Sequence, residues 1–256
     1  MLGEFVLPTS GGLWTATAID VMARLGFSER NTRQALARLS DDDVLRVEHH
    51  GRRARWLLSE SGRQLLAAGA ERIYHFGERR RRWDGRWLLV LCSVPEAQRA
   101  KRRRFQTRMA FSGFGTLAPG IAISPHREAE GEANRIIADL GLGDLALVFV
   151  AGTGSLSPDS EILDRAWDLD ELALGYRAFV DEFGPRQPAD PGCRFEALTE
   201  LVHAWRRFPF ADPEIPARLL PPDWPGLAAE ALFTERRRIW RPDAIGLFTS
   251  LDAAND

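Results

Sequence analysis

A chain of 256 residues with 45% hydrophobic side chains can bury one large core or two to three small ones, which excludes a disordered chain. No stretch approaches the roughly 18 apolar residues of a membrane span, and the opening MLGEFVLPTSGG lacks the charged and apolar regions of a secretory signal. Cys92 and Cys193 lie in no disulfide or zinc pattern. We therefore expect a globular cytoplasmic protein that contacts no membrane.

The charge of the chain is divided between its two ends. Residues 1–110 contain 21 Lys and Arg against 12 Asp and Glu, a net charge of +9. Residues 111–256 contain 13 against 24, a net charge of −11, so the whole chain has a net charge of −2. A basic part joined to an acidic part is typical of a nucleic-acid-binding domain on a sensing or oligomerising body, because phosphate contacts supply most of the sequence-independent affinity. Enzymes also show such asymmetry, so this pattern alone leaves an enzyme open.

The first predicted element is a helix in TATAIDVMARLG, residues 15–26. Ala18, Ile19, Met22 and Leu25 recur at helical spacing and predict its packed face. Gly26 stands where a helix C-cap is expected. Because this glycine-containing turn is short, the next helix is predicted to form a helix-turn-helix with the first.

The second predicted helix begins after Ser28, a favourable N-cap residue. Its packed positions are Thr32, Ala35, Leu36 and Leu39. In a recognition helix the N-terminal residues meet base edges in the major groove, where Arg pairs with guanine and Asn or Gln with adenine. The residues predicted to read bases are Arg30, Asn31, Arg33 and Gln34.

A hairpin is predicted in VLRVEHHGRRARWLL, with strands Val44–His49 and Ala54–Leu58 and a turn at Gly51. Its basic residues are expected against phosphate or in the minor groove. The helix, turn and hairpin together predict a winged helix, although a solvated helix beside an exposed hairpin would show the same pattern. The predicted DNA-binding residues are Ser28, Arg30, Asn31, Arg33, Gln34, Arg52, Arg53 and Arg55.

Two runs of basic residues follow, RRRRW at 79–83 and KRRRF at 101–105. Each is interpreted in four ways: a contact to DNA phosphate, a dimer interface, a site for an anionic effector, or a solvated boundary. Like charges packed this densely repel one another, so we expect an anionic partner or a neighbouring carboxylate.

The middle of the chain predicts alternating strands and helices. The apolar run 87–94 predicts a buried strand, and Pro95 opens a basic helix that continues to about Phe111. A turn and a strand region then cover 113–125, a helix 127–141 and a final strand 144–152. This order of strand, helix, strand, helix and strand suggests a ferredoxin-like α+β domain.

The remainder, roughly 156–250, is predicted to be helical with Pro-rich connectors. Its tryptophans, Trp167, Trp205, Trp224 and Trp240, are predicted to build a core, with a pocket for an aromatic ligand as the alternative. The predicted fold class is α+β in three domains: a winged helix-turn-helix with a linker helix at 1–78, a ferredoxin-like domain at 79–153 and a helical domain at 154–256.

Five stretches of this sequence are similar to one known family. RQALARLSDDDVL and GRRARWLLSESG resemble the winged helix of PaaX-type transcriptional repressors, and residues 83–125, 166–179 and 198–226 resemble later parts of the same family in its order. The chain departs from the family in a shortened first helix, in Thr32 where a larger apolar residue is usual, and in Trp205 where tyrosine is usual.

The resemblance implies a homodimeric repressor that binds a double-stranded DNA operator and responds to an aryl-coenzyme A thioester, with phenylacetyl-CoA as the familiar case. The predicted function is therefore control of an aromatic-acid catabolic operon, such as one for phenylacetate, without enzymatic activity and without a cofactor. The effector-binding residues stay unknown, because Arg206, Arg207 and the arginines of the middle domain are all available for its phosphates.

Two alternatives of other classes remain. The resemblance implies that the middle domain is similar to a CRISPR-associated small nuclease, which binds metal through an acidic residue at the end of the first strand. Here that place reads Cys92–Ser93 with Glu96 as the nearest acid, a poor set of ligands for Mg²⁺ or Mn²⁺, so neither a metal site nor a catalytic residue is predicted. An RNA-binding protein is the third interpretation, but the strand aromatics are few, mostly Trp87 and Phe149.

Overall fold

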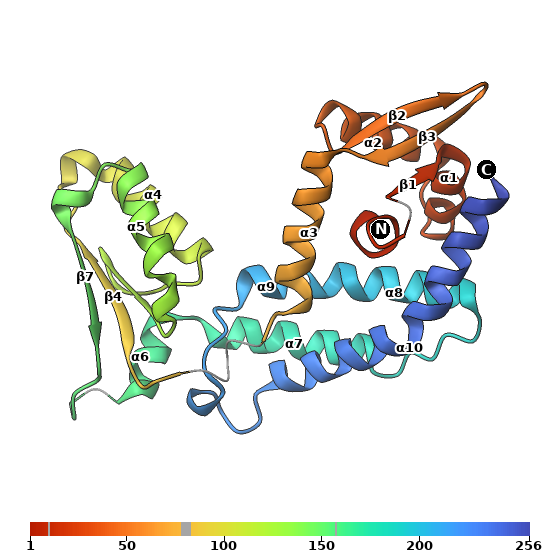
Figure 1. Ribbon diagram of the computed structural model, residues 1–256. Helices are drawn as coiled ribbons and strands as arrows, with labels where there is room; N and C mark the ends of the chain where they lie inside the picture. The colour runs from red at the N-terminus through yellow and green to blue at the C-terminus, as the bar shows by residue number, and fades with distance from the viewer. Residues whose placement is uncertain (10, 78–82, 157) are drawn as a thin grey trace. The chain divides into compact units, whose positions relative to one another are not determined.

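The computed structural model describes residues 1–9, 11–77, 83–156 and 158–256 (Figure 1). The chain divides into two compact units, one of residues 1–75, 181–205 and 231–256 and the other of residues 76–180 and 206–230. Both units contain helices and an antiparallel sheet, which confirms the predicted mixture of helix and strand. The predicted three-domain division stays a prediction, and the basic run at 79–82 lies outside the described residues.

The N-terminal part of the first unit contains a three-stranded sheet and the helices that flank its strands in sequence. Its elements are the helical turn Leu2–Val6, β1 (Gly12–Trp14), α1 (Thr15–Arg24), α2 (Glu29–Asp41), β2 (Leu45–His50), β3 (Arg53–Leu58) and α3 (Glu60–Tyr74). The strand order is β1-β3-β2, with Leu13 and Val47 both opposite Trp56 of the central strand. The two helices and the hairpin predicted from the sequence are therefore present.

Local chemistry explains where these elements begin and turn. The Ser28 hydroxyl accepts a hydrogen bond from the backbone N–H of Asn31 at 3.2 Å and caps α2. Ser59 caps α3 in the same way through the N–H of Gly62. Gly26 and Gly51 have φ values of +83° and +64°, a region that glycine enters without steric cost, and they end α1 and turn the hairpin respectively.

The packed face of α1 differs from the predicted one. The helix buries Thr17, Ala18 and Val21, whereas Ile19 and Met22 are only half-buried. Thr17 is buried because its hydroxyl donates a hydrogen bond to a carboxylate oxygen of Asp252 at 3.0 Å. The buried face of α1 therefore differs from the predicted one because Thr17 has a polar partner far along the chain, and a buried hydroxyl needs a hydrogen bond.

The first unit is completed by the later part of the chain. It contains α8 (Pro191–Trp205), the end of α7 (Leu169–Phe183) and most of α10 (Pro225–Ala254). Phe5 packs against the rings of Phe195 and Phe248, with centroids 4.6 and 5.9 Å away. These contacts anchor the N-terminal turn to α8 and α10.

Glu4 is a buried carboxylate held by cations of α10. Only 3% of it is exposed, and it accepts hydrogen bonds from Arg237 at 3.1 Å and from Arg241 at 2.7 Å. The Tyr74 hydroxyl of α3 also donates to Glu4. Burial and the Glu4 charge raise the pKa of Tyr74 well above its usual value, so the phenol stays a hydrogen-bond donor. Glu4 thereby links the N-terminal turn, α3 and α10.

The second unit contains a four-stranded sheet with two helices on one face. Its elements are β4 (Trp87–Cys92), the short helix Glu96–Gln98, α4 (Arg99–Phe111), β5 (Gly115–Ala118), β6 (Ile121–Ser124), α5 (Glu130–Asp139) and β7 (Ala146–Ala151), in the strand order β5-β6-β4-β7. The core joins Leu88 and Val90 of β4 to Phe105 of α4 and Ile136 of α5. The single strand region expected at 113–125 is wrong, because the chain turns at Gly120 and forms two paired strands there.

The rest of the second unit is helical. It contains α6 (Asp159–Ala166), most of α7, α9 (Phe208–Ala211), the short helix Ala217–Leu219 and the start of α10. The helical structure is interrupted between α6 and α7, where Asp168 accepts a hydrogen bond from the N–H of Glu171. Trp224 of this unit, like Trp205 and Trp240 of the first, is buried, which confirms the predicted core role, while Trp167 is half-buried. None of the described helices, including the 30-residue α10, combines the length and apolarity of a membrane span.

The contacts of Asp252 predict a large loss of stability on its removal. Asp252→Ala leaves the Trp14 N–H, the Thr17 hydroxyl and the Arg55 guanidinium without their shared acceptor, and we expect unfolding free energy to fall by about 2–4 kcal/mol. Asp243→Ala on the same helix removes only the more exposed ion pair with Arg194 and should cost less than about 1 kcal/mol. Urea unfolding of both variants measures the difference, and equal losses would contradict the role of Asp252.

Candidate nucleic-acid interface

One face of α2 is polar and open to solvent. Arg30, Asn31, Arg33 and Gln34 are all exposed, whereas Thr32 and Leu36 on the opposite face are 3% and 4% exposed. The Thr32 hydroxyl donates to the carbonyl of Ser28 at 3.1 Å, which allows this small polar residue to occupy a core position. Four of the residues predicted to face DNA thus lie together in the first two turns of α2, and Ser28 holds the start of the helix.

The side chains on this face are held only weakly. The Arg33 Nε donates to Glu29 at 2.8 Å, but both side chains are more than half exposed, at 57% and 60%. An exposed i,i+4 pair of this kind contributes little to stability, so the guanidinium can exchange its partner readily. Arg30 has no hydrogen bond or ion pair with another described residue.

Apart from Glu29, which pairs with Arg33, the acidic residues of α2 lie at the far end of the helix. Asp41 and Asp42 follow Arg30 by eleven and twelve positions. At 1.5 Å per residue this separates them from Arg30 by about 16 Å along the axis. Because that distance exceeds the Debye length of about 8 Å at physiological salt, these carboxylates scarcely reduce the positive potential at the start of α2.

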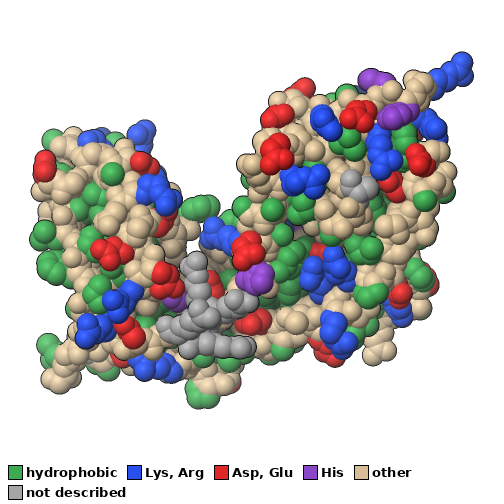
Figure 2. All heavy atoms as spheres, viewed as in Figure 1, with side chains coloured by type: hydrophobic (Ala, Val, Ile, Leu, Met, Phe, Trp, Pro, Cys, Tyr) green, Lys and Arg blue, Asp and Glu red, His purple; other side chains and the backbone are tan. Residues whose placement is uncertain are grey.

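The β2–β3 hairpin carries basic residues at its tip. Arg52 follows the Gly51 turn, is exposed, and has no hydrogen bond or ion pair with another described residue. Arg53 lies 5.0 Å from the Trp14 ring centroid and donates to the backbone carbonyl of Asn255 at 3.3 Å. Figure 2 shows basic side chains reaching outward at the end of this hairpin. The tip therefore presents positive charge on a structured β-ribbon.

Arg55 is placed differently from the other predicted residues. Its side chain is only 22% exposed and forms ion pairs with Asp252 at 3.6 Å and Asp256 at 3.9 Å. It also lies 5.2 Å from the centroid of the Trp14 ring. These contacts tie the base of the hairpin to the end of α10.

The residues at the end of α10 that hold this interface were not predictable from the sequence. Asp252 accepts hydrogen bonds from the backbone N–H of Trp14 and from Thr17, both at 3.0 Å, and it pairs with Arg55. Asn255 contacts Thr17 and Arg53. These residues are separated from their partners by about 200 positions or more, and no local pattern in an isolated sequence indicates such a contact.

The end of β4 does not supply a set of metal ligands. Cys92 is buried, which raises the pKa of its thiol, and Glu96 is paired with Arg102 at 2.7 Å. Among the residues that the structure describes, no group of three or more His, Cys, Asp or Glu side chains is arranged to hold a metal ion. The residues present therefore do not match the hard oxygen ligands that Mg²⁺ or Mn²⁺ requires.

Solved structures include one with a similar fold. The uncharacterized protein Rv0674 from Mycobacterium tuberculosis matches with a TM-score of 0.61 and 21% sequence identity, over 90% of each chain. Among curated proteins, the transcriptional repressor PaaX of Escherichia coli (strain K12) is 28% identical over 243 residues, which cover 91% of this chain and 75% of the relative.

Three models of one protein family match successive parts of the chain. Residues 1–62 match the PaaX-like protein model, residues 80–163 the PaaX protein central Cas2-like domain, and residues 167–249 the PaaX-like protein C-terminal domain. The matches occur in order and leave only short segments uncovered. The chain therefore belongs to the PaaX-like protein family.

Proposed function

We propose that this protein is a sequence-specific DNA-binding transcriptional repressor with a winged helix-turn-helix in residues 1–62. The observation that carries the proposal is the exposed polar face at the start of α2 beside a structured hairpin with arginines at its tip. The name of the curated relative, a transcriptional repressor, supports the same function.

In this proposal α2 is the recognition helix. Arg30 and Arg33 would donate to guanine O6 and N7, while Asn31 and Gln34 would pair with adenine. The buried Thr32 and Leu36 fix the rotation of the helix, and the Ser28 cap fixes its first turn, so the reading face is preorganised.

The hairpin contributes contacts to the DNA backbone. Arg52 and Arg53 would neutralise phosphates and set the register of α2 without reading sequence. Arg55 can reach a phosphate only by exchanging its pairs with Asp252 and Asp256, so its main proposed role is to hold the hairpin base.

The remaining domains would supply assembly and control. The order of β4, α4, β5, β6, α5 and β7, with β4 and β6 central, supports a ferredoxin-like middle domain. We propose a cytoplasmic homodimer whose two recognition helices read half-sites of an imperfect palindrome. An aryl-CoA effector would favour a dimer geometry that no longer matches the half-site spacing, which would release an aromatic-acid catabolic operon.

A nuclease built on the middle domain is not favoured. Its chemistry would need acidic ligands at the end of β4, where Cys92 is buried and Glu96 is already paired with Arg102.

The proposed function is tested first by binding to DNA upstream of the protein's own gene. Fluorescence anisotropy at several salt concentrations should show selective binding with a steep salt dependence, because many phosphates are neutralised. Phenylacetyl-CoA should release the DNA. Selective binding without release would discard this effector and keep the repressor, whereas the lack of selective binding to any upstream segment would refute the repressor.

Arg33→Ala should weaken specific binding by roughly 1–3 kcal/mol and relax preference at one base position, because a bidentate contact to guanine is lost. Arg38→Ala is the matched control, since Arg38 is also exposed on α2 but lies beyond the first two turns. Competition with single-base variants of the bound segment measures the change. Normal selectivity of Arg33→Ala would show that α2 is oriented differently on DNA.

Arg52→Ala should weaken binding to all DNA sequences to a similar extent and lower the salt slope by about 1, because it removes one phosphate contact. Arg52 has no structural partner among the described residues, so the variant should unfold at the same temperature as the parent protein. A loss confined to the specific sequence would instead assign Arg52 to base readout.

A further inference from the structure

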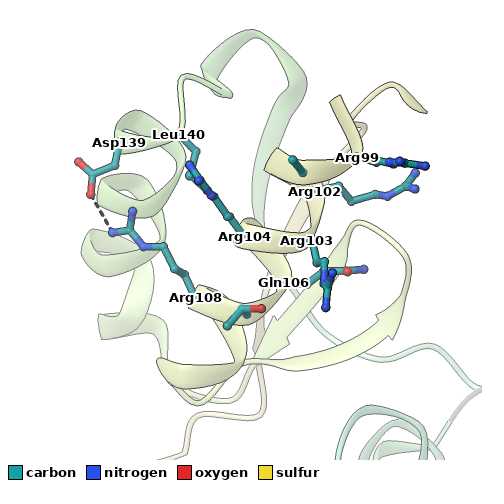
Figure 3. A pocket seen from close by; sticks show the side chains of 10 residues that line it. Arg99, Arg102, Arg103, Arg104, Gln106, Arg108, Asp139 and Leu140 are labelled. Carbon is teal, nitrogen blue, oxygen red and sulfur yellow. Dashed lines mark hydrogen bonds and ion pairs between the residues drawn. The ribbon is translucent and has the colours of Figure 1, made fainter. Parts of the chain in front are cut away.

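Helix α4 carries six cationic side chains within ten residues and no carboxylate of its own. They are Arg99, Lys101, Arg102, Arg103, Arg104 and Arg108. The helix is anchored by Phe105 and Met109, which are each 1% exposed in the core of the second unit. The five arginines line an open hollow of about 920 Å³ that also includes the end of α5 (Figure 3).

Only part of this charge is neutralised within the protein. Arg102 pairs with Glu96 and Arg108 with Asp139, both at 2.7 Å. Arg99, Arg103 and Arg104 are exposed and have no hydrogen bond or ion pair with another described residue. Three guanidinium groups on one helix are therefore free to bind an external anion.

The positions of the cationic residues lower the stability of helix α4. Arg99, Lys101 and Arg102 lie in its first turn, where the helix dipole favours carboxylates and disfavours cations. Arg99 and Arg103 are an i,i+4 pair of like charges, which is destabilising. The core contacts of Phe105 and Met109 keep α4 folded despite these cationic residues, but they do not require them. The cationic residues are therefore explained better by a bound ligand than by the stability of the fold.

We infer that the exposed arginines of α4, namely Arg99, Arg103 and Arg104, bind the phosphate backbone of duplex DNA as a second, sequence-independent contact. The inference rests on the proposed function, because it assigns the same partner to another surface. The α4 contact differs from the proposed contacts of α2 and the hairpin because it uses other residues, lies in the other unit, and reads no sequence.

The distribution of the arginines favours DNA over a small anion. In Figure 3, Arg99, Arg102 and Arg103 lie on one side of α4, whereas Arg104 and Arg108 lie on the side toward the end of α5. From Arg99 to Arg104 the three exposed arginines extend over about 8 Å of helix axis. A small anion is held by donors that converge on one point, but a DNA strand presents a charge about every 3.4 Å along its axis.

The test compares two triple variants of the full chain with equal loss of charge. The first is Arg99→Gln, Arg103→Gln and Arg104→Gln. The control is Arg127→Gln, Arg135→Gln and Arg165→Gln, which removes three exposed arginines of the same unit that are paired with Asp84, Glu132 and Glu161. Thermal unfolding checks both, and the α4 variant should be at least as stable as the parent because it removes repulsion.

Binding is measured on a random-sequence duplex and on the upstream segment over a salt series. The α4 variant should lose roughly tenfold or more in affinity for both at low salt, and its salt slope should fall by about 2.7, or 0.9 for each lost contact. The ratio of specific to random binding should not change, because phosphate contacts carry no sequence information. The control triple should bind as the parent does.

A second measurement uses the unaltered protein. DNA should protect Arg99, Arg103 and Arg104 from modification by phenylglyoxal, as read by mass spectrometry, while inorganic pyrophosphate should not. Protection by pyrophosphate without protection by DNA would assign α4 to a small anionic ligand and overturn the inference.

The remaining outcomes separate the inference from the proposed function. If the α4 variant binds as the parent while Arg33→Ala and Arg52→Ala bind less tightly, the α4 contact is refuted and the repressor stands. If the unaltered protein binds no duplex, both are refuted.

Discussion

The carboxylate of Asp252 joins three separate parts of the N-terminal segment to the end of α10. It accepts hydrogen bonds from the Trp14 N–H at the end of β1 and from Thr17 on α1, and it pairs with Arg55 on β3. Because the residue is only 9% exposed, these partners compete little with water for it. The buried face of α1 and the base of the hairpin are both held by this contact. The end of α10 thereby contacts the base of the proposed DNA-binding hairpin directly.

The basic residues of this protein fall into two physical groups. Arg55, Arg237 and Arg241 are held by buried or partly buried carboxylates and stabilise the fold. Arg52, Arg99 and Arg104 are exposed and have no ion pair with another described residue, so they can bind an external phosphate. Net charge cannot distinguish these groups, because both contribute equally to it. The partner of each guanidinium, rather than the number of arginines, decides which surfaces are available to DNA.

Several features of the interface were predictable from local sequence. The Ser28 cap, the Gly51 turn and the buried positions Thr32 and Leu36 of α2 depend on neighbours within a few positions, and the structure contains all of them. Of the other packed positions predicted in α2, Leu39 is half-buried, whereas Ala35 is exposed and its prediction is wrong. The face of α1 was not predictable in this way, because Thr17 is buried only by virtue of Asp252, 235 positions away. The β5–β6 hairpin was missed for a different reason. Its strands have only four residues each, which is too short for a clear alternation of buried and exposed residues.

The α2 helix, the basic hairpin, the strands β4 and β7 and the helices of the middle segment, and the family to which the chain is similar all follow from the sequence alone. These depend on short-range periodicity, on capping and turn residues, and on motifs that can be read in order. Tertiary contacts set which arginines are paired, which face of α1 is buried, and how Glu4 and Asp252 link the two ends of the chain. Burial and ion pairing join residues that are distant in the sequence, so only the folded chain determines them.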